Sequence, residues 1–427
     1  MSRPVADRLA ELAGTVLGGP LPIRIRAWDG SEAGPPVGPV LVLNSRAALR
    51  RLVWSPGELG IAEAYLAGDV DVDGDLADGL SRVWAAVGRG EVGRPSVRVR
   101  DVPRLAVSAA RLGAVGRRPS RPGSAAALSG TRHSRERDRA AIAHHYDLSN
   151  EFYQLLLDDS MAYSCGYFTT GPTGSLADAQ RAKLDLICRK LGLVEGRRLL
   201  DIGCGWGSLT CHAAQEFGAE VVAVTLSEQQ FRHVSKRVAD AGLSDRVRVR
   251  HADYRELASG ADDAAFDAVA SVEMGEHVGD DEYPGFVAIL RRVLRPGGRA
   301  LVQQMSREGV APGGGAFIET YIAPDMHMKS LATTVGLIAD GGLEVRDVHA
   351  MREHYAWTVA AWARTLETRW DEAVSMVGEV GARVWRLYLA GGGLAFAEGR
   401  MGVDQILAVR PEPDGTSLME PSRRVWE

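Results

Sequence analysis

The chain has little cysteine and no long apolar run, and each shortage excludes a class of protein. Only 4 of its 427 residues are cysteines, with no CxxC pair and no Cys/His cluster at zinc spacing, so we expect neither a disulfide framework nor a metal site. No stretch approaches the ~18 uncharged apolar residues of a membrane span. Asp7, Arg8 and Glu11 interrupt the segment where a secretion signal would need its apolar core. These absences predict a cytoplasmic protein with reduced thiols.

Charge is nearly balanced over the whole chain but unevenly distributed along it. The formal net charge is −5, yet residues 89–139 contain thirteen arginines against four acids, a local +9 that leaves −14 for the remainder. The segment is either a solvated linker or a patch for phosphate-bearing partners, namely anionic lipid headgroups or nucleic acid.

Length and patterning predict more than one domain. Residues 1–87 combine a helical stripe over 1–20 with short β-branched runs at 23–25 and 40–43, which predicts a small α+β domain. Residues 88–134 are rich in Arg, Gly, Pro and Ser and are interpreted as a connector, helical in part around 102–112. The remaining residues, 135–427, form the second domain.

From residue 195 onward, apolar runs alternate with helical patterns. Strands are predicted at 199–202, 220–224, 247–250, 266–272 and 300–304, and helices at 208–217, 227–241 and 283–294. This alternation predicts an α/β fold with a doubly wound parallel sheet and helices on both faces. Its ligand should bind at the carboxyl ends of the strands, near the first strand–helix turn.

The segment 201–207, DIGCGWG, follows the first of these strands and opens a helix. Glycines let the backbone approach a ligand closely, but a glycine-rich loop also occurs in NAD and FAD sites or as a tight turn. Asp201 before the first glycine and the missing third glycine of GxGxxG favour S-adenosylmethionine over a dinucleotide. Thr225 stands where a ribose-binding acid would usually follow the second strand.

Several further motifs, in order along the chain, carry a resemblance to one family. They are EAYLAGD at 63–69, HYDLSN at 145–150, YSCGYF at 163–168, TLSEQQ at 225–230, EHVG at 276–279, HYAWT at 354–358 and WRLYL at 385–389. With them, the chain resembles the cyclopropane fatty acid synthases and the mycolic acid methyltransferases over nearly its whole length. The resemblance implies a class I methyltransferase fold with S-adenosylmethionine as cofactor. The residues implied to contact it are Tyr163, Ser164, Asp201, Gly203, Cys204, Gly205, Thr225, Leu226, Gln230 and Asp253.

The resemblance also implies an unusual reaction. An isolated alkene is held in line with the sulfonium methyl group, methyl transfer leaves a carbocation, and a bicarbonate ion held by Cys, Glu, His and Tyr removes a proton. Cys165, Glu276 and Tyr355 match three of these positions, but Gln303 stands in place of the histidine and cannot shuttle a proton near neutral pH. Glu273 adds a second carboxylate, which we expect to bind or to replace the bicarbonate.

These departures bear on the product. A well-placed base closes the ring to cyclopropane, whereas a slower or displaced base allows a 1,2-hydride shift first and then gives an exomethylene group. We therefore predict a 10-methylene-branched acyl chain, as in the tuberculostearic acid pathway, made on an oleoyl-type chain of a phospholipid lying in an acyl channel. Cyclopropane synthesis is the alternative. More distant alternatives are a nucleic-acid methyltransferase and a lipid-binding protein without catalysis, although no nucleic-acid partner is expected.

The partners follow from the substrate. An enzyme that modifies the middle of a phospholipid chain needs peripheral contact with the inner face of the membrane, and residues 1–87 are the candidate for that contact and for homodimerisation. A methylene product would also need a reductase partner.

Each candidate residue also has a structural explanation. Cys165 is compatible with a small buried apolar residue, His145 with a satisfied buried histidine, and Tyr355 and Trp357 with aromatic residues of the core. Glu276 is harder to explain in this way, because a carboxylate in an apolar channel is costly unless it is used or paired.

Overall fold

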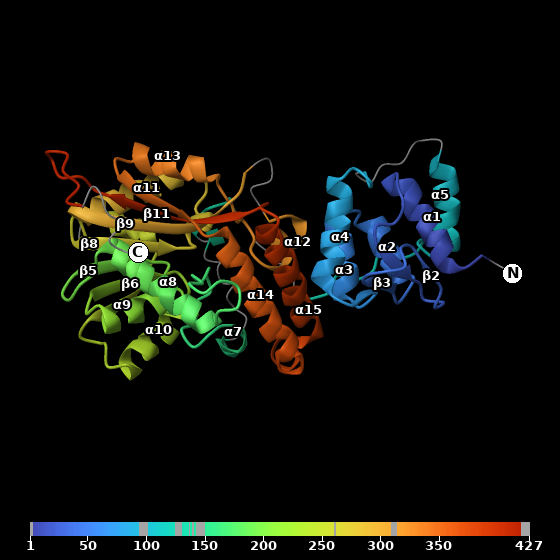
Figure 1. Cartoon of the computed structure of the whole chain (residues 1–427), viewed down its shortest axis with the longest axis horizontal. Helices are drawn as coiled ribbons and strands as arrows, with labels where there is room; N and C mark the ends of the chain where they lie inside the picture. Colours follow the sequence, from blue (N-terminus) through green and yellow to red (C-terminus); the bar gives the residue numbers. More distant parts are fainter. Residues whose placement is uncertain are drawn as a thin grey trace. The chain divides into compact units, whose positions relative to one another are not determined.

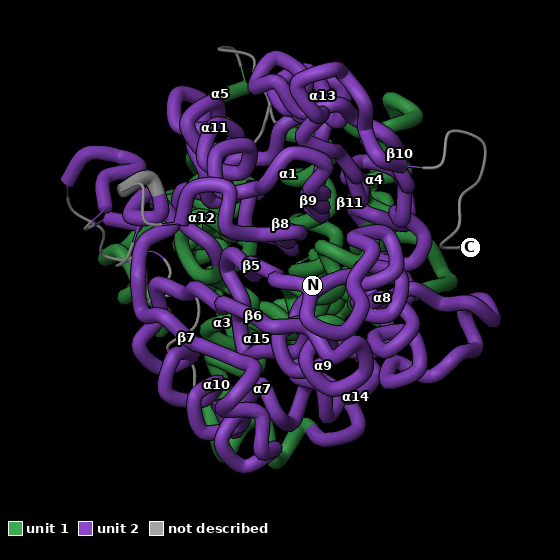
Figure 2. Tube along the Cα trace, turned by 90° about the vertical axis from the view of Figure 1, so that its left-hand side faces the viewer, with its two compact units in different colours: residues 1–125, 315–322, 370–394 green, residues 126–314, 323–369, 395–427 purple. Residues whose placement is uncertain are grey.

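The computed structural model describes residues 3–93, 101–123, 130–135, 137–138, 141, 150–259, 262–308 and 314–419. Its chain separates into two compact units, coloured in Figure 2. The first comprises residues 1–125, 315–322 and 370–394, and the second comprises 126–314, 323–369 and 395–427. This division differs from the boundaries predicted near residues 87 and 134.

The first unit contains a four-stranded sheet in the order β2 (Glu32–Ala33), β1 (Arg24–Arg26), β3 (Val40–Leu43) and β4 (Val70–Asp73). Only the pair of β1 with β3 is parallel. Its helices are α1 (Val5–Leu17), α2 (Ala47–Trp54), α3 (Glu58–Leu66), α4 (Leu76–Gly88), α5 (Val102–Arg111), α12 (Ala316–Tyr321) and α15 (Trp370–Ala397), whose last residues belong to the second unit (Figure 1). The small N-terminal α+β fold is thereby confirmed.

Part of the predicted connector belongs to the core of the first unit. Helix α5 confirms the helical segment predicted around 102–112. Leu112 and Ala114, just after it, are buried in one apolar cluster with Leu9 and Leu49. The described part of the connector therefore packs against residues 1–87, because burying these apolar side chains removes their surface from water.

Acidic side chains pair with several arginines of the same segment. Arg89 lies 2.6 Å from Glu91, and Arg121 lies 3.2 Å from the buried Glu63. These ion pairs offset part of the positive charge that the sequence concentrates there.

The second unit is built on a seven-stranded sheet in the order β10-β11-β9-β8-β5-β6-β7 (Figure 1). Its strands are β5 (Arg198–Ile202), β6 (Glu220–Thr225), β7 (Val247–His251), β8 (Phe266–Val272), β9 (Leu294–Ser306), β10 (Glu344–Ala350) and β11 (Gly402–Val409). Strands β5 to β9 are parallel to one another, as predicted. Strands β10 and β11 follow the predicted strands in sequence and were not predicted; β11 is antiparallel to both β9 and β10, so the sheet is mixed at this edge. An antiparallel edge on an otherwise parallel sheet is common in such folds.

Helices cover both faces of this sheet (Figure 1). Successive strand residues point to opposite faces, so Leu199 packs in one apolar cluster and Leu200 in the other. The first cluster includes residues of α8 (Leu176–Leu191), α9 (Ser208–Glu216) and α10 (Glu228–Asp240). The second includes residues of η2 (Tyr254–Ser259), α11 (Tyr283–Val293) and α13 (Leu331–Asp340). The doubly wound arrangement is confirmed.

The remaining elements of the second unit are α7 (Asn150–Leu156), η3 (Gly275–His277) and α14 (Arg352–Thr368). Among the helices that the structure describes, none combines the length and the apolar character needed to cross a bilayer.

Candidate active site

A cavity opens at the carboxyl ends of β5, β6 and β8, with about 920 Å³ of space when its mouth is included. Apolar and polar side chains both line it, which is typical of small-molecule sites. The predicted residues that it brings together are Gly203, Gly205, Thr225, Leu226, Gln230 and Glu273.

The loop between β5 and α9 needs its glycines. Gly203, Gly205 and Gly207 have φ angles of 78°, 54° and 81°, in the left-handed region that side chains disfavour. A Cβ on Gly203 would also lie 2.9 Å from Cγ of Met274. Backbone N–H groups of Gly203 and Cys204 both donate to the carbonyl of Val224, at 2.9 and 3.0 Å. The loop is therefore held against β6 with its backbone facing the cavity.

The end of β6 fixes a polar group at the same place. Thr225 Oγ1 donates to Gln230 Oε1 at 2.8 Å and accepts from the Ser227 N–H at 3.1 Å. Ser227 in turn caps α10 by accepting from the Gln230 N–H at 3.2 Å. Because Oε1 of Gln230 is engaged, its amide nitrogen is the group left to donate to a ligand.

Three donors converge on the carboxylate of Glu273, just after β8. Cys165 N–H and Gln303 Nε2 donate to Oε1, both at 2.8 Å, and Tyr355 OH donates to Oε2 at 2.6 Å. Protein atoms surround the carboxylate, although the residue as a whole is half-buried because it lines the cavity. Burial raises the pKa of Glu273, while hydrogen bonds from Tyr355, Cys165 and Gln303 oppose the rise.

Gln303 and Tyr355 are themselves fixed. Gln303 Oε1 accepts from Gln405 Nε2 of β11 at 2.9 Å, which orients the Gln303 amide so that its nitrogen faces Glu273. The ring of Tyr355 stacks on Phe396, with centroids 4.3 Å apart.

Glu276 is buried one turn beyond Glu273, in η3. Its Oε1 accepts from the Met305 N–H at 2.5 Å, and its Oε2 has no hydrogen-bond partner among the described residues. Burial, followed by the nearby charge of Glu273, raises the pKa of Glu276 to about 8. Glu276 is therefore mostly protonated at pH 7, with a free oxygen able to carry the proton.

The geometry matches one known family. A family model described as mycolic acid cyclopropane synthetase matches residues 133–406. The chain belongs to this family. Membership confirms the predicted fold and the predicted class of enzyme, an S-adenosylmethionine-dependent fatty acid methyltransferase.

Curated relatives cover nearly the whole chain. A protein from Mycobacterium tuberculosis named "Probable fatty acid methyltransferase Rv3720" is 36% identical over 412 residues, 95% of each chain. Another from the same organism, "Tuberculostearic acid methyltransferase UfaA1", is 34% identical over 426 residues, 96% of this chain and 92% of its own.

Solved structures of the family match a large part of this chain. The cyclopropane synthase MmaA2 from Mycobacterium tuberculosis has a TM-score of 0.59 at 30% identity, over 63% of this chain and 98% of its own. The mycolic acid cyclopropane synthase CmaA1, solved in complex with SAH and CTAB, has a TM-score of 0.58 at 31% identity, over 63% and 97%.

Three of the residues predicted to bind the cofactor are not among the described residues that line the cavity. Asp201 is buried and accepts from Thr210 Oγ1 at 2.7 Å, and burial raises its pKa to about 6. Ser164 Oγ accepts from the buried Lys183 Nζ at 2.9 Å. Cys204 is buried, and burial raises its thiol pKa well above the ordinary value. Direct contact of these side chains with a cofactor stays a prediction.

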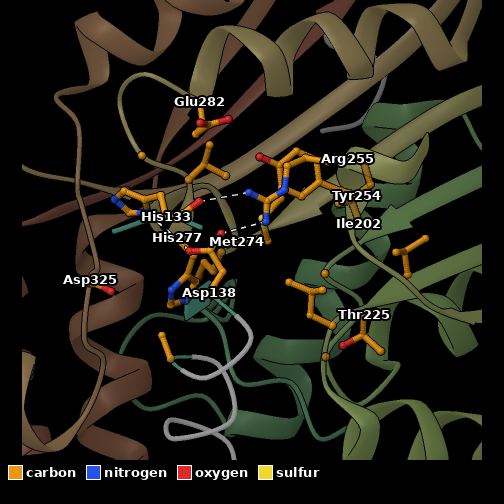
Figure 3. Close-up of a pocket in the computed structure, with 18 of the residues that line it drawn as sticks. His133, Asp138, Ile202, Thr225, Tyr254, Arg255, Met274, His277, Glu282 and Asp325 are labelled. Carbon is orange, nitrogen blue, oxygen red and sulfur yellow. Dashed lines mark hydrogen bonds and ion pairs between the residues drawn. The ribbon is translucent and has the colours of Figure 1, made fainter. Parts of the chain in front are cut away.

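Asp253 and Tyr163 are also outside the described lining but touch groups close to it. Asp253 pairs with Arg255 at 2.6 Å, and Arg255 also reaches Asp138 at 2.9 Å (Figure 3). The ring of Tyr163 lies near Trp206 of the glycine loop, with centroids 6.5 Å apart.

Cys165 contacts Glu273 through its backbone N–H, and its thiol points elsewhere. Its sulfur faces the carbonyls of Gly166 and Met351, at 3.3 and 3.7 Å, and burial raises its pKa well above the ordinary value. The side chain is thus a buried thiol, as the structural explanation expected, while its N–H donates to Glu273. His145 lies outside the described residues, but Asn150 at the end of the same motif accepts from Trp206 Nε1 at 3.0 Å.

Sequence reasoning missed several residues of the site. Arg255, Asp138, Glu282 and Asp325 line the cavity (Figure 3). Asp325 also pairs with Arg137 at 2.5 Å. The charged segment around residue 138 was a signal for this part of the site, because Asp138 lines the cavity and Arg137 pairs with Asp325 of the lining. Gln405 carried no motif, and only strand pairing brings it beside Gln303.

Proposed function

We propose that the protein transfers a methyl group to the double bond of an oleoyl-type acyl chain of a phospholipid and releases a 10-methylene-branched chain. The observation that carries the proposal is the carboxylate of Glu273, held by Cys165, Gln303 and Tyr355 at the edge of the cavity. An uncharged alkene has no proton to lose before methylation, so a fixed base is useful only after methyl transfer.

The cavity fits S-adenosylmethionine. S-adenosylmethionine would be held by the backbone at Gly203 and Gly205, which carries no side chains, and by the amide of Gln230. When bound, this cofactor supplies an electrophilic methyl group on a sulfonium sulfur. Apolar lining residues, among them Ile202, Met274, Val278 and Pro324, offer the acyl chain a surface.

The reaction needs one proton acceptor, because the cation that methyl transfer leaves must lose one proton to give a neutral product. The alkene π pair forms the new C–C bond while the S–C bond breaks toward sulfur, which leaves a cation on the neighbouring carbon. A 1,2-hydride shift moves the cation onto the methylated carbon. Loss of a proton from the new methyl group then leaves its C–H pair as the exomethylene double bond; loss before the shift would close a cyclopropane ring.

Two observations favour the methylene product over the ring. Glu273 cannot approach the methyl group freely, because three donors and its own backbone hold it. Proton removal is therefore delayed, and the 1,2-hydride shift can occur first. Near-full-length relatives include one named tuberculostearic acid methyltransferase, whereas "Cyclopropane mycolic acid synthase 1" of Mycobacterium tuberculosis matches 62% of this chain.

Product analysis tests the proposal. The enzyme is expressed in an oleate-fed host, and the fatty acids are examined by mass spectrometry, since ring and exomethylene groups fragment differently. We expect a methylene product from the wild type and a larger share of cyclopropane from Gln303→His, in which a titratable side chain returns. Cyclopropane alone from the wild type would refute the proposed product.

We also propose peripheral contact with the inner face of the membrane, homodimerisation and a reductase that consumes the methylene product. Exposed apolar residues of the first unit support the membrane contact. Val53, Trp54 and Val115 are 60%, 51% and 73% exposed, and Trp54 Nε1 donates to the carbonyl of Gly116, next to Val115.

A further inference from the structure

An anion site exists beside the cavity, and the protein fills it with its own side chain. The backbone N–H of Cys165, the amide of Gln303 and the hydroxyl of Tyr355 are three donors from three separate segments, and all point to one carboxylate. Donors gathered in this way select a small oxyanion. Here that oxyanion is Glu273.

The backbone of Glu273 is shaped for this purpose. Its φ angle is 52°, in the left-handed region where a non-glycine residue is uncommon, and its N–H donates to the carbonyl of Gln303 at 2.6 Å. Such a conformation is unfavourable for a non-glycine residue and persists only where the surroundings enforce it. The strain turns the side chain back toward the three donors.

A separate bicarbonate ion does not fit this arrangement. The three donors that would hold it are already bonded to Glu273, and Gln303, unlike a histidine, cannot become a cation to offset another charge. The carboxylate of Glu273 already carries a negative charge at this place, so a further anion beside it would meet a like charge. Lys183, which lies buried nearby, donates to Ser164 Oγ, and burial lowers its pKa, which makes its positive charge less available to a further anion.

We propose that Glu273 is the catalytic base and replaces bicarbonate in this enzyme. The inference rests on the proposed function and names the proton acceptor for it. The C–H bond of the new methyl group breaks, its electron pair forms the product's carbon–carbon bond, and the proton passes to Glu273. The proton returns to water through the cavity, which Glu273 lines.

The test compares the wild type with Glu273→Gly and Glu273→Gln in buffer freed of carbon dioxide. Glycine adopts the left-handed φ readily and leaves an empty space that the three donors still face. Glutamine fills this space but cannot accept the proton. We expect the wild-type rate to be unchanged within about twofold by ~10 mM bicarbonate, and both variants to lose about 10²-fold or more, the usual size of a lost general base. Bicarbonate, formate or acetate should restore Glu273→Gly at least about tenfold and leave Glu273→Gln unrestored.

Anion binding gives a second measurement that does not depend on turnover. ¹³C-labelled bicarbonate, followed by NMR, should bind to Glu273→Gly and not to the wild type. A wild type that binds bicarbonate and loses its activity without it would overturn the inference. Failure of every form to methylate an oleoyl phospholipid would instead reject the proposed function, while the difference in anion binding would still be measurable.

Discussion

At the scale of single residues, the two glutamates of the site are held in different ways. Glu273 has three hydrogen-bond donors, whereas Glu276 has one and keeps Oε2 without a partner among the described residues. An unpaired buried charge is costly, so Glu276 is more stable as the neutral acid. The pair therefore combines a hydrogen-bonded carboxylate with a protonated neighbour, a division of roles that requires different surroundings.

The raised pKa of Glu276 predicts a pH-dependent stability. In the folded protein the pKa is about 8, against an ordinary value of 4.5, so the folded chain holds this proton more tightly than the unfolded chain. The stabilisation is fully present below pH 4.5 and is lost as pH rises toward 8. Between these values the free energy of unfolding should fall, relative to Glu276→Gln, by up to ~1.4 kcal/mol per pH unit.

Urea unfolding at several pH values measures this difference. The glutamine of the Glu276→Gln variant cannot ionise, but its amide oxygen can still accept from the Met305 N–H. Glu195→Gln is the matched control, because the Glu195 side chain is 82% exposed. A wild type that loses no more stability with pH than Glu276→Gln would show that Glu276 ionises as easily in the fold as outside it.

Gln405 predicts a positioning effect on the same site. Gln405→Leu removes the donor to Gln303 Oε1 and leaves that buried oxygen unsatisfied, at a cost of about 1–3 kcal/mol. Because Gln303 is then free to turn, we expect kcat to fall about tenfold while the KM for S-adenosylmethionine stays near the wild-type value. Steady-state kinetics at saturating acyl substrate measures both constants; an unchanged kcat would show that Gln303 holds its orientation without Gln405.

At the scale of elements, the glycine loop and the cap of α10 shape the cofactor side of the cavity. The loop requires positive φ angles, and the side chain of Ser227 caps the start of α10. The glycine loop belongs to the local sequence, which explains why the sequence alone predicts it, whereas the cap by Ser227 was not predicted.

Gly203→Ala should therefore weaken cofactor binding. The alanine Cβ would meet Met274 at 2.9 Å while φ stays at 78°, so the loop must move away from the cavity. Isothermal titration with S-adenosylhomocysteine should show about a tenfold loss of affinity or more, which corresponds to ~1.4 kcal/mol.

Gly285→Ala is the control for this change. Gly285 lies inside α11, and a Cβ there would meet nothing within 4 Å. Alanine should raise stability by about 0.5–1 kcal/mol and leave binding unchanged. Equal affinity of the two variants for S-adenosylhomocysteine would show that the glycine loop does not contribute to cofactor binding.

At the scale of the whole molecule, the units differ in what they expose. Val53, Trp54 and Val115 of the first unit present apolar surface to solvent, and scattered apolar residues such as Val194 do so in the second. Transfer of a solvent-exposed Trp side chain into a membrane interface is energetically favourable.

Trp54→Glu should thus weaken binding to vesicles of anionic phospholipid by about tenfold, since a loss of ~1.4 kcal/mol is one decade. Vesicle sedimentation measures the binding, and thermal unfolding checks that the variant is folded. Val194→Glu, at a residue that is 57% exposed, should bind like the wild type. Equal weakening in both variants would point to charge rather than to a contact made by the first unit.

Local sequence determined much of this protein. The five parallel strands, the helices between them and the glycine loop follow from short-range periodicity and from backbone freedom, which act over a few residues. Cys165, Glu273, Glu276, Gln303 and Tyr355 were also selected from motifs.

The tertiary structure decided what these residues do to one another. Gln405 reaches Gln303 only because β11 pairs antiparallel with β9, and residues 102–114 join the first unit through apolar packing and an ion pair between Arg104 and Glu11. Distance along the chain hides such contacts, because hydrogen bonds and apolar burial depend on separation in space. For that reason the sequence predicted the residues of the site, but only the fold shows that three donors point to Glu273. Only the fold, likewise, shows that burial raises the pKa of Glu276.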